Sequence, residues 1–278
     1  MIKSIYFPGK EYATKELLFA DLRVNASRII ETKKADVQKS FEKGFVFDGF
    51  LLPGADDVTK VGPHMKDGYI YAVINTTNYL DSHQDVHFPS LWNKSIKDNA
   101  GKLYYVADHE IKLNTVIAWP EDVNAMVKTV PWAFVGKSYE GNTEALIYEI
   151  DKTKIVNKTA AQIIAEKRPV QNSVRMMYVK IKLAMNSDNP LDAEAKTYFD
   201  TRVNEIANKQ DALDLGYFFG VEEAKIIKEG SMVINGSNDA TPIRQKYFEP
   251  VETTQTNIEP PGGTQKQKSI FSQLIFQK

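Results

Sequence analysis

The sequence predicts a mixed α+β fold, and three observations support this assignment. Segments rich in β-forming residues recur along most of the chain, as in "YIYAVINTT" at residues 69–77. These segments do not alternate regularly with helices, as the strands of a parallel α/β sheet would. One long segment, residues 189–207, repeats its apolar residues at helical spacing instead. With 42% hydrophobic residues in 278 positions, the chain can bury a sizeable core.

The individual elements follow from local composition. The first 43 residues carry scattered charge and contain one predicted helix, near residues 34–43. Runs of β-formers bounded by turn residues predict strands at residues 44–52, 69–77, 102–111, 115–120, 132–137, 144–151, 171–186 and 223–235. Helical patterns and helix-start signals predict helices at residues 88–99, 159–168 and 189–207, and a helix start at Pro120.

Composition also divides the chain into three parts. Residues 1–43 are expected to form an N-terminal extension, and residues 44–246 a folded domain. Residues 247–278 are rich in Thr, Gln, Pro and Gly and are expected to form a flexible linker and tail. The tail ends in the short apolar segment "SIFSQLIF".

Charge and cysteine content exclude several function classes. Lys plus Arg (35) balances Asp plus Glu (36), so nothing in the charge predicts a nucleic-acid partner. The absence of cysteine excludes disulfides, thiolate nucleophiles and Cys-ligated zinc. We find no signal peptide and no run of 18 apolar residues, which predicts a cytosolic protein with no membrane anchor. Phosphate-binding glycine loops and the common hydrolase motifs are also missing from the sequence.

The segment "DSHQDVH" places Asp81, His83, Asp85 and His87 at every second position. In an extended chain two or three of them could reach one zinc or manganese ion. The alternative is a connecting segment whose carboxylates bind backbone amides. We expect the second arrangement, with Asp81 and Asp85 bracing amides, both histidines partly exposed and no metal bound.

Three predicted strands each bring one polar group onto an otherwise apolar face. Ser173, with Arg175, begins the face of residues 171–186 that continues with apolar side chains toward the core. His109 ends the apolar row of residues 102–111, and Glu229 lies on an apolar face of residues 223–235. A serine, a histidine and an acid are the groups that acyl transfer by a serine nucleophile requires.

Four segments, in order, resemble the tailed-phage prohead proteases, which are related in fold to herpesvirus assemblin. They are "DSHQDVHFPSLWNKSI", "ADHEIKLNTVIAWPED", "NSVRMMYVKIKLAMN" and "IKEGSMVINGSNDATP", and together they cover about residues 65–245. The resemblance implies an assemblin-like fold, a curved and mainly antiparallel β-barrel or sheet flanked by helices.

By this resemblance Ser173 is the nucleophile, His109 the general base and then acid, and Glu229 the third member, with Glu222 and Glu223 nearby in the sequence. Arg175 stands where such sequences tend to have a small residue, and it is expected either to crowd the site or to contact the oxyanion or the substrate. No cofactor is implied.

The resemblance also implies a function. The chain would be a serine endopeptidase that cleaves the scaffold and the precursor of the major capsid protein inside the immature head, in the host cytoplasm. Self-cleavage near residues 250–268 and activation by forming a homodimer are implied as well.

Two alternatives remain open at this point. A catalytically inactive head protein that keeps the protease fold for structure or scaffolding is favoured by Arg175 and by the apolar tail. A metal-dependent hydrolase would instead be centred on Asp81, His83, Asp85 and His87.

Overall fold

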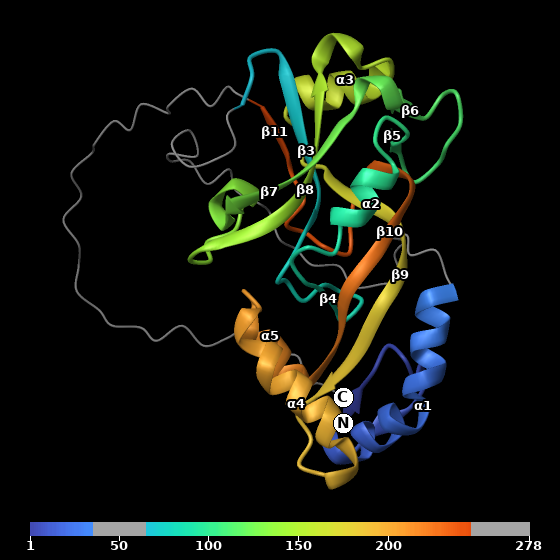
Figure 1. Cartoon of the computed structure of the whole chain (residues 1–278), viewed down its shortest axis with the longest axis vertical. Helices are drawn as coiled ribbons and strands as arrows, with labels where there is room; N and C mark the ends of the chain where they lie inside the picture. The colour runs from blue at the N-terminus through green and yellow to red at the C-terminus, as the bar shows by residue number, and fades with distance from the viewer. Residues whose placement is uncertain (36–64, 246–278) are drawn as a thin grey trace, which may run out of the picture. The chain divides into compact units, whose positions relative to one another are not determined.

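The computed structural model describes residues 1–35 and 65–245 (Figure 1). The α-helices in these ranges are α1 Lys15–Ala35, α2 Asn93–Asp98, α3 Lys158–Ala165, α4 Ala193–Arg202 and α5 Lys209–Leu215. The strands are β1 Ile2–Lys3, β2 Glu11–Tyr12, β3 Tyr69–Thr76, β4 Asp85–His87, β5 Tyr104–Ala107, β6 Val116–Ala118, β7 Asn124–Pro131, β8 Asn142–Asp151, β9 Gln171–Met185, β10 Tyr217–Val233 and β11 Ile243–Gln245. None of these helices combines the length and the apolar character that a bilayer-crossing helix needs.

The strands form open sheets, which confirms an α+β fold with mainly antiparallel pairing. In the larger sheet β10 is central: β9 pairs with one side of it in antiparallel orientation, and β4 and β5 pair with the other side in parallel orientation. The second sheet has the order β11-β3-β8-β7, and all its pairs are antiparallel. Of the two forms that the resemblance implies, a barrel or a curved sheet, the described strands make open sheets with free edges and no closed barrel.

The main core lies between the two sheets. It contains buried side chains of β3, β5, β8, β9 and β10, among them Ile74, Tyr105, Tyr148, Met176 and Ile226. Gly230 makes the close approach of the sheets possible, because a Cβ at this position would lie 2.7 Å from the ring of Tyr148. The predicted strands at residues 69–77 and 144–151 are confirmed as β3 and β8.

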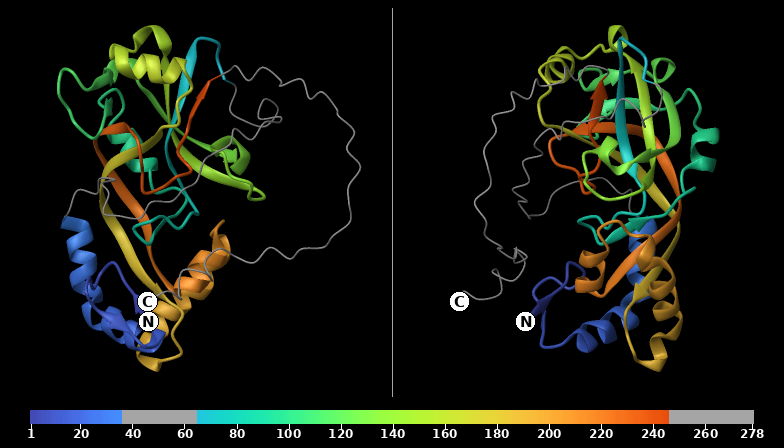
Figure 2. Two further views of the ribbon diagram at one scale, coloured as in Figure 1. Left: turned by 180° about the vertical axis from the view of Figure 1, so that it is seen from behind. Right: turned by 90° about the vertical axis from the view of Figure 1, so that its left-hand side faces the viewer.

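The N-terminal helix α1 was not predicted. Its buried residues, Leu18, Phe19, Leu22, Ile29 and Lys33, face the sheet, and α1 and α4 both pack against β9 (Figure 2). Residues 1–35 thus contribute to the core. The predicted helix near 34–43, the predicted strand at 44–52, the boundary at residue 43 and the tail at 247–278 fall wholly or mostly outside the described residues.

Three other predicted elements differ from the structure. Residues 132–137 form the 3₁₀ helix Trp132–Val135, which Gly136 ends in a left-handed conformation. The predicted helix 189–207 is broken into α4 and two flanking 3₁₀ turns, and α5 follows as a separate helix. Strand β10 begins six residues earlier than predicted, at Tyr217.

The face of β9 that is directed to the core also differs from the prediction. Val174, Met176 and Tyr178 are buried in the core, whereas Met177 and Val179 are only half-buried. The alternation of faces changes near Lys180, where the pairing with β10 shifts register. Ser173 therefore lies on the face of the sheet that points away from the main core.

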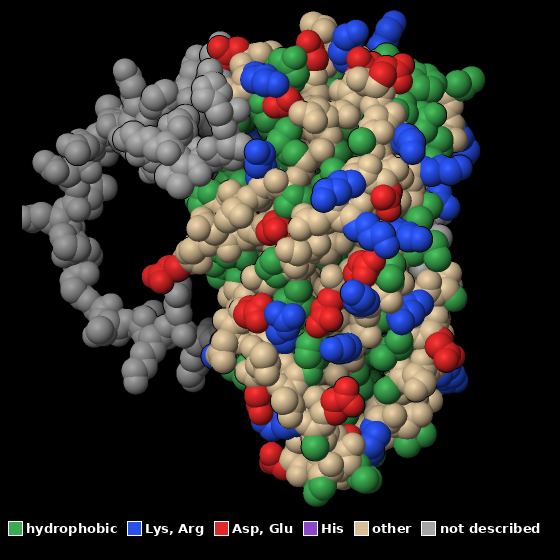
Figure 3. Space-filling model, viewed as in Figure 1, with side chains coloured by type: hydrophobic (Ala, Val, Ile, Leu, Met, Phe, Trp, Pro, Cys, Tyr) green, Lys and Arg blue, Asp and Glu red, His purple; other side chains and the backbone are tan. Residues whose placement is uncertain are grey.

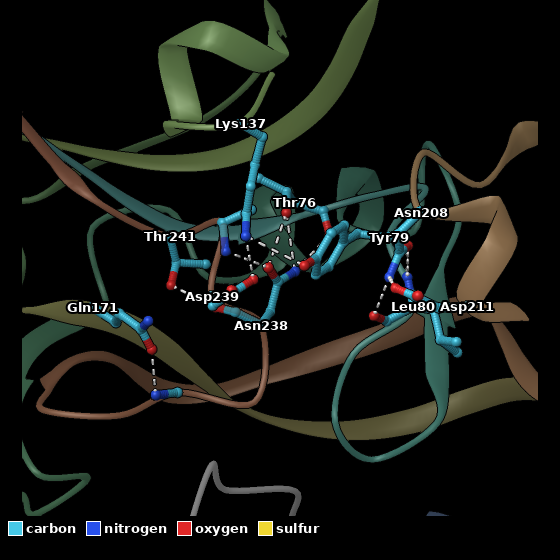
Figure 4. A network of polar contacts seen from close by, with 12 residues as sticks. Thr76, Tyr79, Leu80, Lys137, Gln171, Asn208, Asp211, Asn238, Asp239 and Thr241 are labelled. Atoms are coloured by element: carbon cyan, nitrogen blue, oxygen red, sulfur yellow. Dashed lines mark hydrogen bonds and ion pairs between the residues drawn. The ribbon is translucent and has the colours of Figure 1, made fainter. Parts of the chain in front are cut away.

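The turn after β10 fixes the start of β9, as Figure 4 shows. Asn238 accepts a hydrogen bond from the hydroxyl of Thr76 at 3.2 Å and donates one to the Thr76 carbonyl at 3.1 Å. Thr241 donates its hydroxyl to the carbonyl of Asn172 at 2.7 Å, and Gln171 accepts from the amide of Gly236 at 2.6 Å. These contacts hold the residues directly before Ser173.

Candidate active site

His109 lies in a tight turn that follows β5. Asp108 and His109 both have positive φ angles, 52° and 56°, and the amide of Glu110 donates to the carbonyl of Ala107 at 3.1 Å. A turn with two left-handed central residues is the type I′ geometry. This turn directs the chain away from the core-directed row of Leu103 and Tyr105. His109 was predicted to end that row, and it lies outside it.

Glu229 lies in β10 beside a bulge. Between the pairs Val174 with Gly230 and Met176 with Ile226, β9 contains one residue and β10 contains three, and Lys228 has a φ of 68°. The bulge changes the direction of the side chains that follow it. Glu229 then points away from the main core, on the face opposite to Gly230.

The structure brings His109 and Glu229 together as a buried pair. His109 Nδ1 lies 2.8 Å from Glu229 Oε1, and the two side chains are 2% and 0% exposed. Glu222 and Glu223 do not take this place: Glu222 contacts Tyr198 and Arg202, and Glu223 contacts lysines. Of the predicted acid Glu229 and the two glutamates near it in the sequence, only Glu229 is bound to His109.

Ser173 is the direct cross-strand partner of Ser231, two residues after Glu229 in β10. Paired residues of an antiparallel ladder point to the same face, with Cβ atoms about 5 Å apart. Ser173 therefore lies on the same face of the sheet as His109 and Glu229. A hydrogen bond between Ser173 and His109 is not formed, because His109 Nε2 is buried without a hydrogen-bond partner.

Arg175 follows on the same face, opposite the bulge. Its Nε atom is buried and makes no hydrogen bond, and no ion pair with Glu229 is formed within 4.0 Å. A guanidinium group carries donors that match a carboxylate or an oxyanion. Arg175 thus keeps hydrogen-bonding capacity next to Ser173.

Unsatisfied polar atoms concentrate at this place. Seven buried side-chain N or O atoms of the described residues lack a hydrogen-bond partner, and three of them belong to His109, Glu229 and Arg175. A fourth, the hydroxyl of Tyr148, belongs to a ring on the opposite face of the sheet. Tyr148 packs against Gly230, and burial, followed by the charge of Glu229, raises its pKa well above 10. Native proteins leave few such atoms, and those that remain are often functional.

Access to these residues is restricted. Ser173 is 5% and His109 4% exposed, so neither side chain is open to a substrate in this structure. A hollow in the described surface lies elsewhere, between Tyr139 and the start of α5 at Asn208–Asp211, and none of the predicted catalytic residues lines it. On the face drawn in Figure 3, acidic and basic side chains are intermingled.

The segment at residues 81–87 forms a second polar centre. Asp81 accepts hydrogen bonds from the amides of His83 and Asp85 at 2.9 and 3.0 Å, as predicted. The prediction for Asp85 is wrong: its carboxylate binds Lys33 Nζ at 2.7 and 2.8 Å and accepts the hydroxyl of Tyr178 at 2.8 Å. Lys33 comes from α1, so this ion pair attaches the helix to the sheet.

His83 is partly exposed as expected, whereas His87 is buried. His87 Nδ1 lies 2.9 Å from Asn75 Nδ2, and His87 Nε2 lies 3.2 Å from the Tyr178 hydroxyl. Both ring nitrogens of His87 therefore have hydrogen-bond partners inside the protein. Ligand atoms of Asp81, His83 and Asp85 lie within 4.8 Å of one another and could hold a metal ion. The ammonium group of Lys33 already supplies the positive charge at Asp85.

Burial shifts two pKa values in this centre in opposite directions. Burial, and then the charge of Asp85, raises the pKa of Asp81 from 3.8 to about 6. Burial lowers the pKa of His87 from 6.5 to about 4. The stability that Asp81 contributes is complete below pH 3.8 and is lost as the pH rises through 6. The contribution of His87 is complete above pH 6.5 and is lost as the pH falls through 4.

Sequence reasoning missed Lys33 and Tyr178, and it did not recognise the contact that Ser231 makes with His109. A buried lysine in an amphipathic helix resembles a surface lysine in sequence, and Tyr178 shares its predicted face with two lysines. The position of Ser231, two residues after Glu229, was the one available signal. Comparison with protein-family models, with curated proteins and with solved structures finds no match.

Proposed function

We propose that the chain is a serine endopeptidase in which Ser173 is the nucleophile, His109 the general base and Glu229 the acid. The observation that carries the proposal is the buried contact of His109 Nδ1 with Glu229, which leaves Nε2 unpartnered on the face of Ser173. In serine hydrolases the acid binds one ring nitrogen and the serine uses the other.

The proposed reaction follows from these positions. His109 Nε2 takes the proton of Ser173 Oγ while the oxygen attacks the carbonyl carbon of a peptide bond. Arg175 stabilises the oxyanion that forms, since its guanidinium group makes no ion pair with Glu229. The imidazolium then protonates the leaving amine, and water hydrolyses the acyl ester by the same route. Ser173 and His109 come into contact when substrate binds.

The resemblance to prohead proteases supplies the proposed substrates and setting. These are the scaffold and the precursor of the major capsid protein, cleaved inside the immature head in the host cytoplasm. An assemblin-like arrangement of the sheets, self-cleavage and a homodimer belong to the same proposal.

Co-expression with the precursor capsid protein, followed by mass spectrometry of the products, tests this function. The Ser173→Ala variant should lose processing by more than about a thousandfold, the loss that follows removal of a covalent nucleophile. Circular dichroism of the variant should show a folded protein, which separates loss of the nucleophile from loss of the fold. Processing by Ser173→Ala at the wild-type rate would refute the assignment of the nucleophile.

A non-catalytic head protein is the second candidate. The burial of Ser173 and His109 and the missing hydrogen bond between them favour it. In that case the wild type would leave its true capsid precursor uncut, while Glu229→Gln would still destabilise the fold by breaking a buried pair.

A further inference from the structure

The turn that carries His109 requires an external support. Asp108 and His109 are both left-handed, a conformation that is unfavourable for residues other than glycine. The closing hydrogen bond from Glu110 to Ala107 lies within the turn and does not attach it to the sheet. Besides the Thr115 hydroxyl, which donates to the carbonyl of Glu110 at 2.6 Å, contacts from β10 hold this conformation.

Ser231 provides one of these contacts through its side chain. Its hydroxyl oxygen accepts the backbone N–H of His109 at 2.8 Å, and the hydroxyl can donate to the carbonyl of Val106 or of Met232, each at 3.2 Å. The amide of Asp108 donates to the Met232 carbonyl at 3.0 Å. Two successive amides of the turn are thus bound by two successive residues of β10.

The same strand also binds the imidazole. Glu229 lies two residues before Ser231, so both side chains point to the same face. One binds the ring at Nδ1 and the other binds the backbone of the same histidine. A single contact at Nδ1 would leave the ring free to swing, whereas two contacts fix the direction of Nε2.

We propose that Ser231 is a positioning residue, which holds His109 so that Nδ1 meets Glu229 and Nε2 is directed toward Ser173. Ser231 is fully buried and its hydroxyl is committed to backbone groups, so it is not itself the nucleophile. The inference rests on the proposed role of His109, but the contact it describes can be measured without any activity.

Nuclear magnetic resonance of the full chain tests the proposal. The chain has only four histidines, so the ring N–H signal of His109 can be assigned by its loss in a His109→Gln variant. We expect this signal in the wild type and its loss in Glu229→Gln. In Ser231→Ala its exchange with water should be at least tenfold faster, and Ser231→Thr, which keeps the hydroxyl, should restore the slow exchange.

Ser95→Ala is the matched control. Ser95 is also buried, and its hydroxyl also accepts a backbone amide of β10, from Ile226 at 2.7 Å. The Ser95→Ala substitution removes the same kind of contact at a different place. It should lower the stability of the fold by a similar amount and leave the His109 signal unchanged. Equal exchange rates in Ser231→Ala and Ser95→Ala would overturn the proposal.

A kinetic measurement adds a second readout where the wild type processes its substrate. Ser231→Ala should lower kcat by about 10–100-fold and leave KM nearly unchanged, as expected when a catalytic group is displaced by about 1 Å. A rise in KM at constant kcat would contradict a positioning role. If the wild type cuts no substrate but the His109 signal still depends on Ser231, the positioning role is supported and the proposed peptidase function is refuted.

Discussion

Replacing Lys33 with methionine should destabilise the fold by about 3–5 kcal/mol, because it leaves the carboxylate of Asp85 buried without its partner. The side chains of Lys33 and Asp85 are 9% and 0% exposed, and Nζ contacts both carboxylate oxygens. Methionine has a similar length and keeps most of the packing of the lysine stem.

The magnitude follows from the geometry. At a separation of 2.7 Å, an effective dielectric constant of about 20 gives an attraction of roughly 6 kcal/mol. The cost of desolvating both ions offsets much of this attraction in the wild type. In the variant the desolvation of Asp85 remains and the attraction is gone. One hydrogen bond from Tyr178 is then the only described side-chain contact that compensates the charge.

Urea unfolding followed by circular dichroism measures the effect. With a slope of about 2–3 kcal/mol per molar urea, the midpoint should fall by roughly 1–2.5 M. Lys196→Met is the matched control, since Lys196 binds both oxygens of Asp200 within a helix but in an exposed setting. It should change stability by less than about 0.5 kcal/mol. Equal midpoints for the two variants would show that burial of the ion pair has no energetic consequence.

Three further predictions concern the two polar centres. Because the folded pKa of Asp81 is raised and that of His87 lowered, Asp81→Asn should lose stability relative to the wild type as the pH falls from 6.5 to 4. His87→Gln should gain stability relative to the wild type over the same range. Urea unfolding at several pH values measures both differences, and a change of the two variants in the same direction would contradict the reasoning. Purified protein dialysed after exposure to zinc or manganese should retain less than one equivalent of metal, because Lys33 neutralises Asp85; stoichiometric retention by elemental analysis would contradict this. Glu229→Gln should leave partial processing activity if the acid only orients the imidazole, and loss of the folded circular-dichroism signal would show a structural role instead.

The sequence predicted the strands whose β-formers are continuous, and it placed Ser173, His109 and Glu229 at polar positions on strand faces. It could not predict their exact directions, because period-two alternation assumes a ladder without bulges. The bulge before Gly230 depends on pairing between β9 and β10, which no local pattern reports. In the same way the positive φ of His109 is stabilised by contacts from a strand about 120 residues later.

Helix α1 was missed for a different reason. Its apolar positions are interrupted by charged residues, and one of its buried residues is Lys33, whose partner Asp85 lies far along the chain. Local propensity treats a lysine as a solvent-exposed residue. Only the folded structure shows that the helix is attached through a charge.

The central place of β10 in its sheet has a consequence for folding during synthesis on the ribosome. Its partners β4 and β5 are made more than 100 residues earlier, and β9 also precedes it. Until residues 217–233 have left the exit tunnel, these three strands have no common partner and expose their hydrogen-bonding edges. In a nascent chain that pauses before Tyr217, these edges are therefore expected to stay open to pairing with other chains.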